Sequence, residues 1–146
     1  ALIKLSPNRG DALNNLANVL IVLKDPGAIA MAERALKVDA RNPTYLDTAG
    51  WAHLTQGNNV DRALQYLRDA RLRSPNDGEV RYHLAAALAR SQRTAEARTE
   101  LDAALQAADQ VGQPAVVRHA LGKGLDPLVG RLAEHAAPGL LRSVRV

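Results

Sequence analysis

Apolar residues recur along most of this chain at the spacing that marks one face of an α-helix. Leucines and alanines follow i, i+3, i+4 and i+7 intervals, which would bury one stripe on each helix. Breaks such as Asp25-Pro26, Asn42-Pro43 and Ser74-Pro75 separate the runs, and Asp25-Pro26 has the form of an N-cap followed by a first helical proline. We therefore predict six helices, over residues 11–24, 26–38, 44–56, 60–73, 78–91 and 94–108.

A second pattern repeats at a longer interval. In each second helix two alanines stand seven residues apart, and Gly50 and Ala85 stand midway along two of the preceding helices. The alanine pairs are Ala28 and Ala35, Ala63 and Ala70, and Ala97 and Ala104. The first alanines of successive pairs are 35 and 34 residues apart. Small residues let two helices approach closely, and a helix pair that cannot cover its own apolar stripe must stack on its neighbours.

A two-helix repeat of this length with these small residues resembles the tetratricopeptide repeat (TPR). The resemblance implies an all-α fold, a right-handed α-solenoid of three TPR-like helix pairs plus a C-terminal capping helical segment. We expect the array over residues 1–110, with residues 1–8 as the end of a preceding repeat and 111–146 as the capping tail. The repeats would cover about 9–42, 43–77 and 78–110.

Three features depart from the TPR pattern. Ala40 stands where a closing proline is expected, the third repeat has no turn glycine, and the Asn58-Asn59 turn carries one extra residue. More finely, "NNLA", "LDTAGW" and "EVRYHLA" resemble the C-terminal repeats of bacterial TPR proteins of exosortase (PEP-CTERM) systems. That resemblance implies an accessory role in exopolysaccharide production or export and a place in the cell envelope or periplasm; without it, we expect a cytoplasmic protein.

Composition agrees with a helical domain. Apolar residues make up 47% of the 146 residues, phenylalanine is absent, and strong helix formers dominate over β-branched runs. The absence of cysteine excludes disulfides and thiolate metal sites. No stretch approaches the roughly 20 apolar residues of a membrane span, so we expect none.

The positive charge is concentrated in the tail. Residues 1–110 carry 14 basic and 13 acidic side chains, whereas residues 111–146 carry five basic and two acidic ones. A nearly neutral body argues against a nucleic-acid groove along the repeats. We therefore expect a protein or peptide partner and no nucleic acid.

Catalytic and metal-binding motifs are missing from the sequence. The four histidines, at 53, 83, 119 and 135, have no metal-ligand spacing, and we expect them to be solvated or to lie near helix caps. Lys123 lies in a Gly-Lys-Gly stretch that lacks the remaining residues of a phosphate loop. We predict no enzyme, cofactor or metal. The alternative is an enzyme site at the junction of the tail and the repeats, with His119, Glu134 and His135.

A partner would bind on the concave face, which the first helix of each pair lines in stacked repeats. The predicted groove residues are Asn14, Asn18, Asp47, Trp51, Thr55, Glu79, Tyr82 and Arg90. Asn14 and Asn18 would form a ladder of amides that pairs with an extended peptide backbone. Against this, exposed asparagines are often only solvated, and Trp51 could fill the joint between the first two pairs.

The tail, residues 111–146, holds five glycines and three prolines and breaks the repeat pattern. We predict a short helix near 114–122 that caps the last repeat and a second over 127–136. The leading functional hypothesis is a protein-interaction scaffold. The alternative is a structural module whose tail drives formation of a homo-oligomer.

Overall fold

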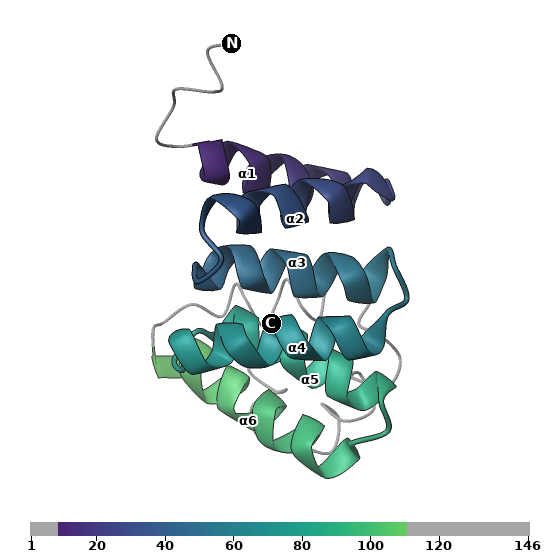
Figure 1. Cartoon of the computed structure of the whole chain (residues 1–146). Coiled ribbons are helices and arrows are strands. Elements are labelled where there is room, and N and C mark those ends of the chain that lie inside the picture. The colour runs from purple at the N-terminus through teal and green to yellow at the C-terminus, as the bar shows by residue number, and fades with distance from the viewer. Residues whose placement is uncertain (1–8, 111–146) are drawn as a thin grey trace, which may run out of the picture. The chain divides into compact units, whose positions relative to one another are not determined.

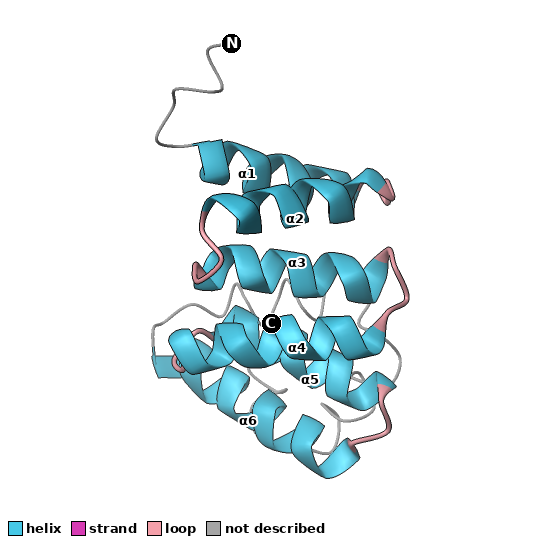
Figure 2. Ribbon diagram, in the orientation of Figure 1, coloured by secondary structure: helices cyan, strands magenta, loops and turns pink. Residues whose placement is uncertain are grey.

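The computed structural model describes residues 9–110, and the side chains of residues 9–107. All regular structure in this part of the chain is α-helical, as predicted (Figure 2). The helices are α1 (Arg9–Val22), α2 (Gly27–Val38), α3 (Pro43–Thr55), α4 (Val60–Arg73), α5 (Gly78–Arg90) and α6 (Thr94–Gln110). Each end lies within two residues of its predicted position.

The chain divides into two compact units between Ser74 and Pro75. The first contains α1 to α4, which Figure 1 shows as successive rows, and in it α1 packs on α2, α3 packs on α4, and both α1 and α2 contact α3. The second contains the pair α5 and α6. The all-α class and the three helix pairs are therefore confirmed. The predicted tail helices, near 114–122 and 127–136, lie outside the described residues.

Side-chain caps fix most of the helix starts. Asn42 accepts hydrogen bonds from the N–H groups of Thr44 and Tyr45, and Asp77 caps α5 in the same way. Asn59 accepts from Arg62 N–H at the start of α4. Asp25 Oδ1 accepts from Gly27 N–H at 2.8 Å, as an N-cap does, although α2 begins one residue later than predicted. These bonds satisfy helix N–H groups that have no partner within the helix.

The turn inside each pair contains a non-glycine residue with positive φ: Lys24 at 56°, Asn58 at 47° and Gln92 at 63°. Lys24 and Gln92 are each followed by a residue whose N–H bonds to a carbonyl five residues earlier, the Schellman arrangement. In the second pair this bond spans six residues, because the Asn58-Asn59 turn holds the extra residue that the sequence predicts.

The predicted alanine pairs form the contact surfaces of the second helices. Ala28, Ala63 and Ala97 are fully buried, and the second alanine of each pair is at most 6% exposed. Gly50 of α3 provides the deepest notch. A Cβ atom there would stand 2.5 Å from Leu67 Cγ and 3.3 Å from the Ala63 carbonyl oxygen, both on α4. Leu67 therefore occupies space that only a glycine leaves open.

A nearly buried ion pair joins the two helices of the second unit. Arg81 Nη1 of α5 lies 2.9 Å from Glu100 Oε2 of α6, and their side chains are 17% and 10% exposed. Arg81 Nε also donates to the Pro75 carbonyl at 2.6 Å. Removing Glu100 would take this carboxylate away from the nearly buried Arg81 guanidinium, which is destabilising.

Replacing Gly50 by alanine tests the notch. The added methyl group must displace Leu67, and overpacking of this kind costs about 1–3 kcal/mol. The higher helix propensity of alanine offsets at most about 1 kcal/mol of this cost. We therefore expect Gly50→Ala to lower the free energy of unfolding, measured by urea titration, by about 1–2 kcal/mol. In a Leu67→Ala background, which removes Cγ, the same change should cost less. An equal cost in both backgrounds would contradict the proposed contact.

Replacing Gln92 by glycine tests the turn. A positive φ costs an ordinary residue roughly 1–2 kcal/mol, and glycine gives back about 0.5–1 kcal/mol of this through its more flexible unfolded state. We expect Gln92→Gly to raise the free energy of unfolding by about 0.5–1 kcal/mol, measured from the urea midpoint. Asn58→Gly is the control and should gain less, because asparagine tolerates this conformation.

Candidate functional site

The two units divide the predicted groove residues between them. Five lie on the first helices of the first unit: Asn14 and Asn18 on α1, and Asp47, Trp51 and Thr55 on α3. α1 and α3 are in contact, and we call the surface that these five residues are predicted to form the α1–α3 face. Glu79, Tyr82 and Arg90 lie on α5 in the second unit.

Asn14 and Asn18 differ in exposure. Asn18 is exposed, whereas Asn14 is only 4% exposed. Asn14 Oδ1 is buried and has no hydrogen-bond partner within the described part of the chain. A buried acceptor without a partner costs roughly 1–3 kcal/mol. A donor from another molecule would satisfy this oxygen only after the Asn14 side chain turns toward the surface, because the atom is buried in the free chain.

The α3 residues of this face are buried or half-buried. Asp47 is 8% exposed, and it stands 33 residues after Asn14, at the equivalent place in its own helix. Trp51 and Thr55 are half-buried, and the Thr55 hydroxyl donates to the Trp51 carbonyl at 2.8 Å. That bond uses the hydroxyl proton inside the helix, so Thr55 can offer a ligand only its remaining acceptor capacity.

Tyr45 joins α3 to α1. Its side chain is 6% exposed, lies against Gly10, and donates a hydrogen bond to Asp11 Oδ1. Burial, then the hydrogen bond to Asp11 and the negative charges of Asp11 and Asp39, raise the pKa of Tyr45 to about 12. The neutral phenol therefore helps to hold α1 and α3 together at neutral pH.

On α5 the three predicted residues lie at different depths. Glu79 is exposed, whereas Tyr82 and Arg90 are half-buried. The Tyr82 ring lies beside His83, with 5.9 Å between the ring centroids. In the second unit, α5 thus offers one carboxylate at its first turn and one guanidinium at its last.

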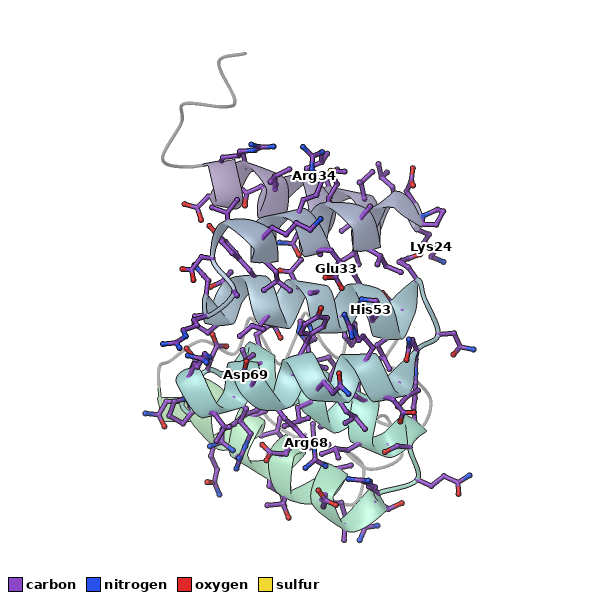
Figure 3. All side chains as sticks on the ribbon, viewed as in Figure 1. Lys24, Glu33, Arg34, His53, Arg68 and Asp69 are labelled. Carbon is purple, nitrogen blue, oxygen red and sulfur yellow. The ribbon has the colours of Figure 1, made fainter. Side chains whose placement is uncertain are left out.

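The sequence did not predict a polar cluster that joins three helices of the first unit. Glu33 of α2 accepts hydrogen bonds from His53 Nε2 of α3 at 2.8 Å and from the Tyr66 hydroxyl of α4 at 2.9 Å. Figure 3 shows Glu33 and His53 facing one another between α2 and α3. Arg62 lies 5.2 Å from the centre of the Tyr66 ring. Burial and the bond to Glu33 raise the pKa of Tyr66.

This cluster changes the interpretation of the histidines. His53 does lie in the last turn of α3, but its partner is on a neighbouring helix. His83 lies inside α5 and is 8% exposed, so the prediction of a solvated or cap-side residue is wrong there. The reason is that α5 is buried along most of its length. His119, Glu134 and His135, the residues of the alternative enzyme site, lie outside the described residues.

Comparison with known proteins supports the assignment of the helix pairs as a helical repeat. Residues 54–118 match the family described as tetratricopeptide repeat, and this match supports a TPR protein. TPR repeats generally mediate protein–protein interaction and are typically not catalytic. No curated protein matches the chain. Among the described helices, none has the length and apolar character needed to cross a membrane.

Raising the pH tests the Tyr45 joint. Because the folded-state pKa exceeds the unfolded value of 10.0, the contribution of Tyr45 is fully present below pH 10 and is lost as the pH rises through about 12. We expect Tyr45→Phe to show a smaller loss of unfolding free energy over this range than the parent chain, and to lack the latest phenolate absorbance step. Identical alkaline profiles would contradict the assignment.

Proposed function

We propose that this chain is a protein-interaction module that binds an extended peptide segment along the α1–α3 face. The observation that carries the proposal is the buried Oδ1 of Asn14, which has no partner among the described residues, next to the exposed amide of Asn18. The two residues are one helical turn apart, so their side chains point to the same side. Successive peptide groups of an extended strand offer N–H donors and carbonyl acceptors that suit such amides.

Trp51 and Asp47 add contact area and charge to the same face. A half-buried indole supplies a large apolar surface, which suits the aliphatic part of a peptide side chain. Asp47 adds a carboxylate to the α3 side of this face. A partner segment with a basic residue at this place is the best complement to it.

Two extensions of this proposal rest on sequence alone. The sequence stretches "NNLA", "LDTAGW" and "EVRYHLA", which resemble repeats of exosortase-system TPR proteins, support a role as an accessory protein in bacterial exopolysaccharide production or export. The alternative, self-association through the tail, is supported by the change of composition after residue 110.

Peptide selection followed by mutation tests the interaction module. Peptides would be selected from a random displayed library on the whole chain, and the affinity of the best peptide measured by calorimetry and by the fluorescence of Trp51, the only tryptophan. We expect the double variant Asn14→Ala plus Asn18→Ala to bind about 5- to 150-fold more weakly, since two lost hydrogen bonds correspond to roughly 1–3 kcal/mol.

Gln65→Ala is the matched control, because it removes an exposed amide from α4, a second helix. This variant should bind the peptide as the parent does. Equal affinity of the parent and the double asparagine variant, with unchanged helicity, would rule out the α1–α3 face as the binding site.

A further inference from the structure

The end of α3 carries two predicted groove residues on one side and two anchoring residues on the other. Trp51 and Thr55 are four residues apart, so they point to the same side of the helix. His53 lies about 200° from Trp51 around the helix axis, and Gln56 lies about 60° from His53. The contacts of His53 and Gln56 are therefore made behind the side that would face a ligand, and they limit rotation of this turn about its axis.

Gln56 ties the end of α3 to the end of α1. Its side-chain Nε2 donates to the Ile21 carbonyl at 3.3 Å, and its backbone N–H donates to the Ala52 carbonyl of α3. The last four carbonyls of a helix have no partner within that helix, which makes Ile21 a suitable acceptor. Ile21 lies three residues after Asn18, another predicted groove residue. The bond therefore holds the end of α3 against the turn of α1 that carries Asn18.

Glu33 ties the same part of α3 to α2 and α4. Its carboxylate accepts from His53 Nε2 at 2.8 Å and, through both oxygens, from the Tyr66 hydroxyl at 2.9 Å. The side chains of His53 and Glu33 are only 14% and 32% exposed. Hydrogen bonds shielded from water in this way are stronger than exposed ones. Gln56 and Glu33 together connect the end of α3 to the three other helices of the first unit.

The contact of Tyr45 is too far away to hold this end of α3. Tyr45 bonds to Asp11 and stands six residues before Trp51, which is about 9 Å along the helix. Helix ends open more readily than helix centres, because fewer contacts hold them. Without Gln56 and Glu33, the turn that carries Trp51 and Thr55 would therefore move even while the start of α3 stays in place.

We infer that Glu33 and Gln56 are positioning residues for the α1–α3 face, which hold Trp51 and Thr55 toward the ligand and make no contact with it. This inference rests on the proposed function. Holding the turn in one orientation raises the fraction of chains that are competent to bind, and the apparent affinity falls with that fraction when an anchor is removed. The loss is in the association rate, because the contacts of the finished complex stay the same.

The fluorescence of Trp51, the only tryptophan, tests the positioning in the free chain. We expect Glu33→Ala and Gln56→Ala each to raise the rate constant of acrylamide quenching at least about twofold, since a turn that opens exposes the half-buried indole. Glu33→Gln should restore most of the parent value, because its amide oxygen still accepts hydrogen bonds. Tyr45→Phe, which removes a hydrogen bond at the other end of α3, is the matched control and should leave quenching unchanged.

The peptide selected on the parent chain tests the consequence for binding. We expect Gln56→Ala to lower the association rate constant about 3- to 10-fold and to leave the dissociation rate constant within about twofold of the parent value. The double variant Asn14→Ala plus Asn18→Ala should instead raise the dissociation rate constant, because these two residues are proposed to contact the peptide.

Unchanged quenching in both alanine variants would overturn the inference, and so would an equal increase in Tyr45→Phe. Faster dissociation with unchanged association in Gln56→Ala would also overturn it, since Gln56 would then be a contact residue. Unchanged affinity of the double asparagine variant would reject the proposed binding site alone. The quenching measurements would still decide whether Glu33 and Gln56 position Trp51, because they need no peptide.

Discussion

The close approach of α3 to α4 at Gly50 is the contact on which the first unit depends. Leu67 occupies the space that a Cβ atom would fill, and Ala63 allows the two backbones to come near enough for this. The dispersion and hydrophobic contributions to folding stability are gained in full only when the two helix surfaces fit together without voids. The position of α3 follows from this contact, and α3 in turn carries the residues that meet every other helix of the unit.

Polar side chains then fix how α3 is oriented. Toward α1 it uses Tyr45, which bonds to Asp11, and toward α2 and α4 it uses His53, which shares Glu33 with Tyr66. Hydrogen bonds with such directional requirements select one arrangement among several that would bury similar apolar area. A wall held in this way is organised before a ligand arrives, which lowers the entropy cost of binding.

The helices and their small-residue contacts could be predicted because the signals are local and repeated. Helix ends follow from caps such as Asn42, and the buried alanines follow from a seven-residue spacing seen three times. The Glu33 cluster could not be predicted, because nothing in one sequence connects residues 20 and 33 positions apart in the chain. The burial of Asn14 was also beyond reach, since it depends on tertiary packing around α1 rather than on any local pattern. The positive φ of Gln92 could not be predicted either, because a turn of this geometry usually contains a glycine and here it contains a glutamine.

Nuclear Overhauser spectroscopy of the chain with labelled leucine methyl groups tests the central contact most directly. If α3 and α4 meet through the notch at Gly50, the α-protons of Gly50 give strong cross-peaks to the methyl groups of Leu67, because a Cβ at Gly50 would lie within 3.0 Å of Leu67 Cδ2. Leu67 methyl groups without cross-peaks to Gly50, in a chain with native helicity, would contradict this packing.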